Sequence, residues 1–430
     1  MSEDAERQLR LEQLNDAFRP AGPVDQERLF AGRVEQRERV AAAVSTPGQH
    51  VAIYGERGIG KTSLAAVSVA SARSRSMIAL RVNCNKGDDF QLIWDSAVDQ
   101  VIEQRDMPWW NSTWDPHVDA FVEIMGRDSS ILAEPDRIRL ALTRLSQATR
   151  VLIFFDEFDV IEDEEVADQM ASTIKTLSDH LVDATVAIVG VAGTIDELIE
   201  GHQSIQRCLD QIQMPRMSPS ETEYIVMRGL RELNMGGSDP VLHFINRVSM
   251  GFPQYAHLLG RSFAKCAIRR GSDVIQSSDL HDALTDAVSG VQQSISTLYN
   301  SSVFSPNRKA IYKQVLLACA LASADSEGFF TPRLVADPLS VLLGRTVRSD
   351  TFNSHLKEFC ESRGPLLEAR GRPKMWRYRF VDPAMGPYVI LLGAMDGLVR
   401  FNVSEDEVDD FSDPPDSSGA GDSVEQQPLF

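Results

Sequence analysis

The clearest chemical signal in the sequence is the loop Gly55-Glu-Arg-Gly-Ile-Gly-Lys-Thr62, which satisfies the pattern G-x4-G-K-[ST]. It follows a short apolar run at 50–55 and opens a segment of helical character, as a phosphate-binding loop must. Glycines let the backbone curl so that successive N–H groups face a phosphate, and the amino terminus of the helix adds a favourable dipole. We expect Lys61 to reach the β and γ phosphate oxygens and Thr62 to give its hydroxyl to Mg²⁺. The residues expected to hold the nucleotide are Gly55, Glu56, Arg57, Gly58, Ile59, Gly60, Lys61, Thr62 and Ser63.

A second signal is the apolar run 151–155, followed at once by Asp156 and Glu157. Such a run is typical of a strand at the centre of a parallel sheet, and open α/β sheets bind ligands at the carboxyl ends of their strands. Asp156 is expected to lie beside the metal, and Glu157 to take a proton from the attacking water. The alternative is a pair that caps the following helix. Asp159 and the acidic run 162–165 are interpreted as a solvated helix start.

The elements that must position these residues follow from the periodicity of the chain. Short apolar runs, with helical segments between them, predict strands at 50–55, 77–83, 150–156, 185–192 and 211–217. This alternation indicates right-handed βαβ units in a parallel five-stranded sheet covered on both faces. The expected fold class is therefore α/β, of the P-loop NTPase type.

Beyond residue 217 the alternation stops and only helices are predicted at first. Ser218 with Glu221 makes a capping box that opens three or four of them, which we interpret as an all-helical lid. From about residue 303, three helices are followed by two short strands around Gly371, the pattern of a winged-helix domain. The expected divisions are a polar lead-in at 1–25, the nucleotide-binding core at 26–217, the helical lid at 218–298, the winged-helix domain at 299–400 and an acidic disordered tail at 401–430.

The composition is that of an ordinary globular protein, with 43% hydrophobic and 24% charged residues among 430. Nine of the acidic residues behind the net charge of −19 lie between Glu405 and Glu425, in the expected tail. The remainder is still acidic, which argues against wrapping nucleic acid over the whole surface. The chain has no apolar run of membrane-spanning length and no secretory signal, and its five cysteines are scattered. A cytoplasmic location without a membrane partner is therefore expected.

Taken together, these motifs resemble those of the AAA+ ATPases of the origin-recognition and initiator clade and of their relatives, the STAND signalling NTPases. Phe30-Ala-Gly-Arg33 is similar to the segment that covers the adenine, and Arg81-Val-Asn-Cys84 to the end of the second strand in that clade. The resemblance covers about residues 26–395. It implies ATP and Mg²⁺ as cofactors, ATP hydrolysis as the activity and Arg33 as a nucleotide contact.

Two positions depart from the initiator pattern. The fourth strand of that clade usually ends in an Asn that senses the γ-phosphate, but here the place falls on Gly193, and Thr194 is the nearest polar substitute. The lid arginine falls on Gln254, next to Pro253 in a Gly-x-Pro sequence that is closer to the STAND pattern. The resemblance thus implies Thr194 and Pro253 as nucleotide contacts. Because a missing cation near the γ-phosphate removes stabilisation of the transition state, slow turnover is expected.

Arg207 ends a segment, 202–207, that resembles the helix offering an arginine finger to a neighbouring subunit. As a finger it would act in trans, require a homo-oligomer and stabilise charge in the transition state. The alternative is a surface arginine after the fourth strand. The partners implied are ATP or ADP together with a nucleotide-dependent homo-oligomer or a separate effector protein.

The predicted hairpin of the third unit carries five basic residues and two aromatics in twelve positions, 368–379. Cationic side chains on such a wing can lie along a phosphate backbone and supply salt-dependent affinity. The alternative is a half-buried hairpin whose polar face is merely cationic, and the preceding helix carries Glu358 and Glu361, which makes it a poor groove reader. The candidate DNA contacts are Arg370, Arg372, Lys374, Arg377 and Arg379.

Three functions remain open on this evidence. The first is an AAA+ or STAND-like switch that binds Mg-ATP, hydrolyses it slowly and couples its nucleotide state to assembly or to a partner. The second is a DNA-binding ATPase, initiator-like or a transposition regulator, that uses the basic wing. The third is a non-catalytic adaptor that docks a partner through the wing and a loop, 107–114, in which three tryptophans concentrate. That loop can equally plug onto the core of its own domain.

Overall fold

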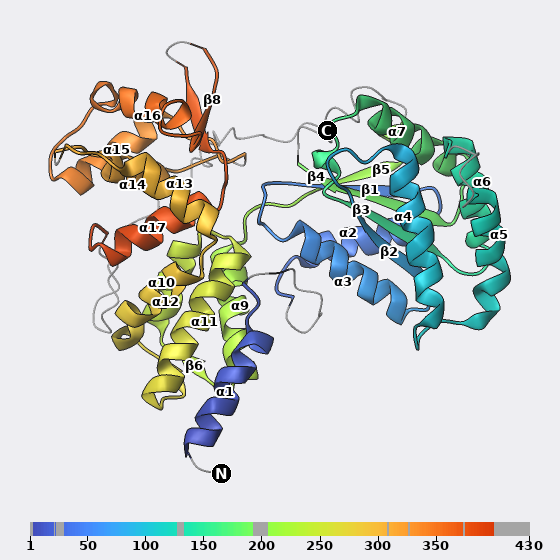
Figure 1. Cartoon of the computed structure of the whole chain (residues 1–430), viewed down its shortest axis with the longest axis horizontal. Helices are drawn as coiled ribbons and strands as arrows, with labels where there is room; N and C mark the ends of the chain where they lie inside the picture. Colours follow the sequence, from blue (N-terminus) through green and yellow to red (C-terminus); the bar gives the residue numbers. More distant parts are fainter. Residues whose placement is uncertain are drawn as a thin grey trace, which may run out of the picture.

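The computed structural model describes residues 3–20, 22, 30–126, 133–191, 205–307, 309–325, 327–372 and 375–399. The expected tail at 401–430 lies outside these residues. Figure 1 shows an α/β core to the right, and to the left a group of helices below a smaller C-terminal unit.

A five-stranded parallel sheet forms the centre of the nucleotide-binding core, in the order β2-β3-β4-β1-β5. Every residue of β3 and β4 is buried, because helices cover both faces of the sheet, and this explains their continuous apolar sequence. The predicted α/β class with a five-stranded parallel sheet is confirmed. The strands are β1 (His50–Tyr54), β2 (Ile78–Asn83), β3 (Val151–Asp156), β4 (Ala184–Gly190) and β5 (Leu209–Gln213).

Two hydrophobic clusters divide the side chains of the sheet between its faces. Leu152 and Phe154 of β3 belong to one cluster, together with residues of α2 and α3, whereas Ile153 and Phe155 belong to the other, with residues of α4 to α7. The period of two along the strand thus places α2 and α3 on one face and α4 to α7 on the opposite face (Figure 1). The core helices are α2 (Val34–Ser45), α3 (Lys61–Ser74), α4 (Phe90–Glu103), α5 (Asp115–Met125), α6 (Pro135–Leu145) and α7 (Glu164–Asp179).

The fifth strand lies a few residues earlier than the expected 211–217. Its ladder runs from Leu209 opposite His50 to Gln213 opposite Tyr54. Beyond that point β1 has ended and the phosphate-binding loop begins, so residues 214–218 have no partner strand to continue along. They form the connection to the next helix instead.

Five helices follow the sheet and are called the lid below: α9 (Pro219–Glu232), α10 (Asp239–Ser249), α11 (Pro253–Arg270), α12 (Leu280–Gly290) and α13 (Gln293–Val303). The capping box of Ser218 and Glu221 opens α9, as predicted. Strands do not stop entirely at 218, because β6 (Gly236–Gly237) and β7 (Val274–Ile275) form a small parallel pair. The expected division at 298/299 falls inside α13.

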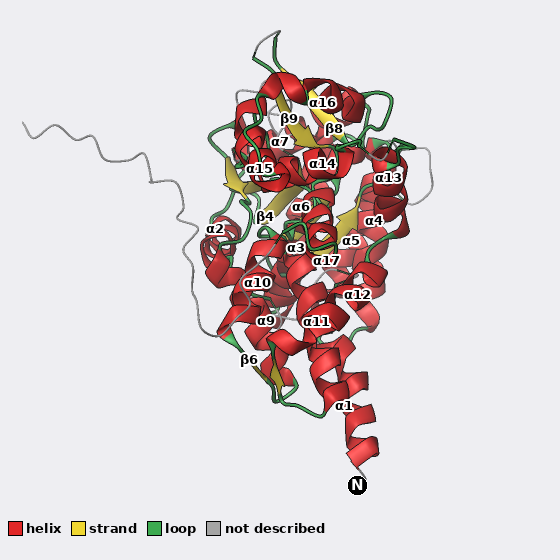
Figure 2. Cartoon of the chain, turned by 90° about the vertical axis from the view of Figure 1, so that its left-hand side faces the viewer, coloured by secondary structure: helices red, strands yellow, loops and turns green. Residues whose placement is uncertain are grey.

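The amino-terminal segment is more than a polar lead-in, because α1 (Glu3–Ala17) packs along the lid. Figure 2 shows α1 beside α11 at the end of the molecule opposite the C-terminal unit. Phe18, at the end of this helix, is 1% exposed. A Cβ atom at Gly229 would lie 2.3 Å from the Phe18 ring, and one at Gly260 would lie 2.6 Å from it. The two glycines therefore provide the space into which the ring fits.

The C-terminal unit contains the expected three helices and hairpin, followed by one further helix. Its hairpin is antiparallel, from Leu367 opposite Phe380 to Arg370 opposite Arg377, and is called the wing below. The additional helix, α17, is almost entirely apolar and packs against α14 and the lid. The hydroxyl of Tyr255 in α11 donates to the carbonyl oxygen of Ala384 just before α17, at 2.7 Å. The elements are α14 (Tyr312–Leu321), α15 (Pro332–Leu343), α16 (Asn353–Cys360), β8 (Leu367–Arg370), β9 (Arg377–Phe380) and α17 (Met385–Met395).

The tryptophan loop plugs onto its own domain. Trp114 is buried, and its ring lies edge-on to that of Trp110, with 5.0 Å between the centroids. Trp109 is half-buried, with the Arg73 guanidinium 5.2 Å from its ring centroid. These contacts favour the interpretation that the loop packs onto its own domain over the interpretation that it is an exposed docking site for a partner protein. Within the part of the chain that the structure describes, no helix combines the length and apolar character needed to cross a bilayer.

Candidate nucleotide-binding site

The phosphate-binding loop joins β1 to α3 at the carboxyl edge of the sheet, as the sequence predicts. Gly58 and Gly60 have φ values of 82° and 96°, in the left-handed region where a side chain is strained. Gly60 is the amino-terminal cap of α3, so the free N–H groups of that helix face the loop. This is an anion-binding arrangement made by the backbone.

Lys61 is folded back onto the loop that precedes it. Its ammonium donates to the carbonyl oxygen of Gly55 at 2.9 Å and to that of Glu56 at 2.8 Å. Burial lowers the pKa of Lys61, while the charges of Asp159 and Asp156 raise it. Because a phosphate carries full negative charge, the Lys61 ammonium forms a stronger hydrogen bond to a phosphate than to these carbonyl oxygens. It is therefore expected to leave the carbonyls when a phosphate is bound.

Asp156 ends β3 directly beside the start of α3. The Thr62 hydroxyl donates to its Oδ1 atom at 3.4 Å, and the Glu157 N–H donates to the same atom at 3.0 Å. Burial raises the pKa of the Asp156 carboxyl. Its Oδ2 atom is buried and has no hydrogen-bond partner among the described residues. An unpartnered carboxylate oxygen next to a threonine hydroxyl fits Mg²⁺, which prefers oxygen ligands and takes the remainder from phosphates and water.

Glu157 is one of the residues that line the main cavity. Its backbone adopts the left-handed conformation with φ of 58°, and its side chain is exposed. It does not cap α7, because Asp163 accepts from the N–H of Glu165 there. An exposed carboxylate that lines this cavity is accessible to water.

The phosphate region opens into a cavity of about 630 Å³ between the core and the lid. Its polar lining includes Lys61, Thr62, Asp156 and Glu157 from the core and Gln254 from the lid. A smaller hollow beside it is lined by Phe30, Ala31 and Arg33, from the segment expected to cover the adenine. Its other lining residues include Ile59, Met217, Ile225, Pro253 and His257.

Arg33 connects the segment expected to cover the adenine with the phosphate-binding loop. It is buried, with φ of 57°, and its guanidinium donates to the carbonyl oxygen of Ile59 at 3.1 Å. Its backbone N–H donates to Glu221 of the lid at 3.0 Å. Burial lowers the pKa of Arg33, and the Glu221 carboxylate opposes that effect. The structure therefore places this residue against the loop, where the sequence analysis expects a nucleotide contact.

The lid meets the loop through apolar contact. A Cβ atom on Gly60 would lie 3.7 Å from Pro253, and one on Gly58 would lie 3.6 Å from Phe252. His257, one turn further along α11, is buried, and burial lowers its pKa to about 4. It is neutral at pH 7 and accepts the backbone N–H of Arg19 at 3.5 Å. The lid therefore brings no positive charge to the phosphates through its Gln254 and His257.

Residues 29–189 match the family model described as the AAA ATPase domain. This part of the chain is an AAA ATPase domain. Among solved structures, the Walker-type ATPase paby2304 of Pyrococcus abyssi is 14% identical, with a TM-score of 0.51 over 86% of this chain and 99% of that one. At this identity the likeness shows the fold.

Two further structures were found with lower TM-scores. The ORC2 protein of Aeropyrum pernix, in its ADPNP-ADP complexes, is 16% identical with a TM-score of 0.44, over 88% of this chain and 98% of that chain. Cdc6p of Pyrobaculum aerophilum is 12% identical with a TM-score of 0.43, over 90% and 99% respectively. No curated protein matches the sequence.

Asp159 belongs to the nucleotide site of this AAA ATPase domain, and the expectation that it is a solvated helix residue is wrong. Its side chain is only 8% exposed, and one of its oxygens accepts from the guanidinium of Arg57 at 3.2 Å. A Cβ atom on Gly190, at the end of β4, would lie 3.4 Å from the same carboxylate. The turn of η3 (Phe158–Val160) carries Asp159 back toward the sheet, and no motif in the sequence announces that turn.

Of the predicted residues, Arg207 is described and lies away from the site, and two others cannot be placed. Thr194 and Lys374 lie outside the described residues. Arg207 precedes β5, whose first residue pairs with the first residue of β1, so it lies at the opposite edge of the sheet from the AAA ATPase domain's phosphate loop. Its side chain is 74% exposed and forms an ion pair with Asp179 at 2.9 Å. This position does not reach the nucleotide of the same chain.

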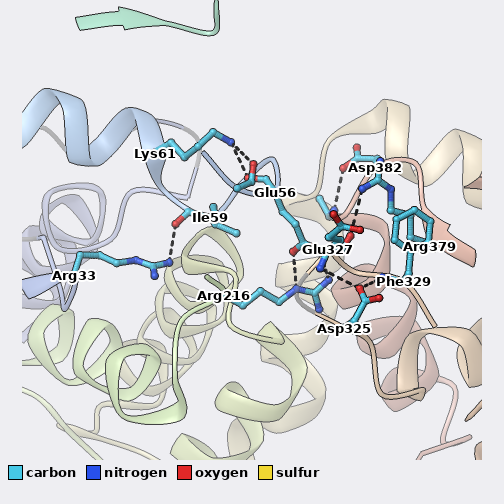
Figure 3. A network of polar contacts seen from close by, with 12 residues as sticks. Arg33, Glu56, Ile59, Lys61, Arg216, Asp325, Glu327, Phe329, Arg379 and Asp382 are labelled. Carbon is cyan, nitrogen blue, oxygen red and sulfur yellow. Dashed lines mark hydrogen bonds and ion pairs between the residues drawn. The ribbon is translucent and has the colours of Figure 1, made fainter. Parts of the chain in front are cut away.

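Glu56 connects the phosphate loop of the AAA ATPase domain to the C-terminal unit. Its side chain, 12% exposed, accepts two hydrogen bonds from Arg216, at 2.7 and 3.0 Å. The Arg216 guanidinium lies 4.8 Å from the ring centroid of Phe252 in the lid. A Cβ atom at Gly328 would lie 2.3 Å from the Glu56 carboxylate, so that glycine abuts it directly. Figure 3 shows Arg216 reaching Glu56 beside the loop that carries Asp325, Glu327 and Phe329.

The same loop, 325–329, neutralises part of the wing. Arg377 forms an ion pair with Asp325 at 3.0 Å, and Arg379 donates to the carbonyl oxygen of Glu327 at 3.3 Å. Both guanidinium groups also lie over the Phe329 ring, at 5.1 and 4.6 Å from its centroid. Arg370 also forms an ion pair with Glu327, at 3.9 Å. Three of the predicted DNA contacts are therefore engaged within the chain, next to the point where Glu56 contacts this loop (Figure 3).

Proposed function

We propose that the chain is an ATP-binding, slowly ATP-hydrolysing switch of the AAA+ or STAND-like kind, whose nucleotide state is transmitted to its C-terminal unit. The observation that carries the proposal is the contact of Glu56 with Arg216 and Gly328. A residue inside the phosphate loop, Glu56, thereby contacts Gly328 in the C-terminal unit, which is far away along the chain. A structural change at that loop on nucleotide binding can therefore reach the C-terminal unit directly.

The transmitting step follows from the position of Lys61. Without phosphate, its ammonium ties down the carbonyl oxygens of Gly55 and Glu56. When a phosphate takes the ammonium, these two carbonyls lose a charged donor, and the backbone of Glu56 is free to adjust. Because the Glu56 side chain is fixed by Arg216, the adjustment acts on the neighbouring Gly328 loop. The change at Glu56 is local, and it alters the contacts that the Gly328 loop makes with the wing.

Hydrolysis rests on the residues that line the cavity. Glu157 is the general base for the attacking water, and Thr62 with Asp156 supplies the oxygen ligands for Mg²⁺. When bound, Mg²⁺ neutralises charge on the β and γ phosphate oxygens. At the position of the usual lid arginine the chain has the neutral Gln254, which supports slow turnover. Arg207 would complete a neighbour's site, in a homo-oligomer whose formation depends on nucleotide.

The test is an equilibrium titration of the full chain with ATP and with ADP in the presence of Mg²⁺. Lys61→Ala is expected to weaken binding of both nucleotides at least tenfold, because a charge-assisted contact to phosphate is lost. Glu157→Gln is expected to bind ATP like the parent and to abolish turnover. Unchanged ATP affinity in Lys61→Ala would contradict the proposal. Turnover that is absent from the parent and from Glu157→Gln alike, with partner binding intact, would favour the non-catalytic adaptor instead.

A second candidate function is DNA binding through a winged-helix C-terminal unit. It is supported by the exposed tip of the wing, where Met375 is 74% and Trp376 is 39% exposed between arginines. An apolar wedge flanked by cations is a device by which proteins enter a groove. Duplex binding that weakens steeply with salt is expected, and Arg370→Glu with Arg372→Glu should remove it. If that double variant binds duplex DNA as the parent does, the wing is not the contact.

A further inference from the structure

The charges around the phosphates are distributed unevenly. Among the described residues, the cations that line the main cavity are Arg19, Arg57 and Lys61. Arg19 lies beside His257, at the lid, through its backbone hydrogen bond. Lys61 is expected to contact the β and γ phosphate oxygens. Arg57 is the remaining cation, and it comes from the loop itself.

Arg57 occupies a position from which it can change partners. It lies between Gly55 and Gly58 in the loop whose N–H groups face the phosphates, and its side chain is 70% exposed. Its present partner, Asp159, is held on the floor of the cavity beside the end of β4. The charges of both residues act on Lys61, that of Asp159 raising and that of Arg57 lowering the pKa of its ammonium. The pair therefore borders the place of the terminal phosphates.

We propose that Arg57 is a second cation of the same chain, beside Lys61, that binds the terminal phosphate of ATP, with Asp159 as the positioning residue that holds it when that phosphate is absent. This rests on the proposed function, since it needs ATP in this cavity. A guanidinium forms two parallel hydrogen bonds to a phosphate, whereas a mostly exposed ion pair such as Arg57 with Asp159 contributes little on its own. Exchange of one partner for the other therefore favours the triphosphate.

The consequence is selectivity between ATP and ADP. ADP lacks the phosphate that would draw Arg57 from Asp159, so the pair stays closed when ADP is bound. When ATP is bound, its terminal phosphate takes Arg57 from Asp159. The Arg57 guanidinium then supplies at that phosphate the positive charge that the neutral Gln254 of the lid does not supply. The loop then distinguishes the two nucleotides by which anion its arginine touches.

The experiment is isothermal titration of the full chain with a non-hydrolysable ATP analogue and with ADP, both with Mg²⁺. Arg57→Ala is expected to weaken binding of the analogue about 10- to 100-fold and binding of ADP less than threefold, the range for one charge-assisted contact. Arg57→Lys should recover part of the loss. The matched control is Arg105→Ala, which removes a similar surface pair with Asp119 at 2.7 Å, outside the cavity, and should change neither affinity.

Asp159→Asn tests the positioning role by the ratio of the two affinities. Freed from its carboxylate, Arg57 should bind the analogue more tightly relative to ADP, and this gain should vanish when Arg57→Ala is added. Equal losses for both nucleotides in Arg57→Ala, or no loss for the analogue, would overturn the inference while leaving the proposed function intact. A parent chain that binds neither nucleotide would overturn both.

Discussion

Asp156 combines a functional role with a cost to the nucleotide-free fold. Burial raises the pKa of its carboxyl, opposed by the Thr62 hydroxyl and the charge of Arg81. A carboxyl whose pKa is higher in the folded than in the unfolded chain stabilises the fold most when it is protonated, at pH below its unfolded value. That stability is lost as the pH rises through the folded pKa. At neutral pH the charged form is therefore held at a cost that a ligand with positive charge removes.

Asp156→Asn should accordingly make the nucleotide-free protein more stable at pH 7, by a rise in Tm on the order of a few °C. The difference from the parent should shrink as the pH falls through the raised folded pKa of Asp156, and it should be gone once the pH is below the ordinary value of a carboxyl. Melting curves with and without Mg-ATP measure both effects, and the variant should lose most of the Mg-dependent protection. Asp119→Asn, an exposed carboxylate, is the control. A variant less stable than the parent at pH 7 would show that the charge is satisfied in the fold.

Sequence reasoning could place the phosphate loop between a strand and a helix, because the glycine spacing, the lysine and the threonine have a mechanism that depends on local geometry alone. It missed Asp159, since the role of that residue comes from a turn after β3 and from a partner, Arg57, 102 positions earlier. It also gave no sign that Glu56 faces Arg216. Pairs of opposite charge are too common in a sequence for their contacts to be read from it.

Among the elements, α1 shows how a helix of polar appearance can belong to a core. Its buried contact with the lid is concentrated in Leu14, Ala17 and Phe18, and Leu11 is partly buried against the same core. Phe18 fits the space left by two glycines on α9 and α11. The helix therefore couples these two lid helices from outside.

Phe18→Ala should lower the free energy of unfolding by about 3–5 kcal/mol, the usual cost of emptying such a site. Urea denaturation followed by circular dichroism measures the change. Leu9→Ala on the same helix, where the side chain is 45% exposed, is the matched control and should stay within about 0.5 kcal/mol of the parent. Similar midpoints for Phe18→Ala and the parent would mean that α1 is not an integral part of the lid.

The elements that were predicted best are the strands at the sheet centre, where burial on both faces leaves a continuous apolar run. The edge strand β5 was displaced in the prediction because its burial alternates and its true limit is set by the end of β1. Helix α17 was not anticipated, since its apolar sequence has no amphipathic period to mark it. Its environment, between α14 and the lid, is created only by the tertiary fold.

At the scale of the molecule, Arg216 stands where the three units meet. It follows β5, lies against Phe252 of the lid and binds Glu56, which abuts the C-terminal unit. Any rearrangement of the units must preserve or break this contact, because a nearly buried carboxylate without its partner is costly. The contact is thus suited to hold one arrangement in one nucleotide state.

Arg216→Ala should lower the free energy of unfolding by about 2–3 kcal/mol, since Glu56 is left without its charged donor. Part of this loss should return in Arg216→Ala with Glu56→Gln. Hydrogen exchange of residues 327–330, with and without an ATP analogue, is the decisive measurement. In the parent the nucleotide should change the protection of this loop, and in Arg216→Ala it should not. An identical nucleotide response in both proteins would contradict the transmission route.

The sequence indicated the order of the units but not their mutual contacts. The expected division at 298/299 cuts α13, because the helix continues into the C-terminal unit instead of ending in a linker. Tyr299 of that helix packs edge-on against Tyr388 of α17, at 5.6 Å between centroids. A composition shift marks a boundary only where few contacts cross it, and here many do.

Glu56 occupies one of the positions that the phosphate-binding pattern leaves open to any residue. Selection at that position is therefore set by what the side chain touches, which is Arg216 and the glycine at 328. Among relatives, these three positions should change together: chains that keep the C-terminal unit in this place should keep an acid, an arginine and a glycine. Relatives that have lost the C-terminal unit, or in which it lies elsewhere, should vary at all three positions while they keep Lys61 and Asp156. Covariation across a family, without any further structure, would then record when the switch was gained or abandoned.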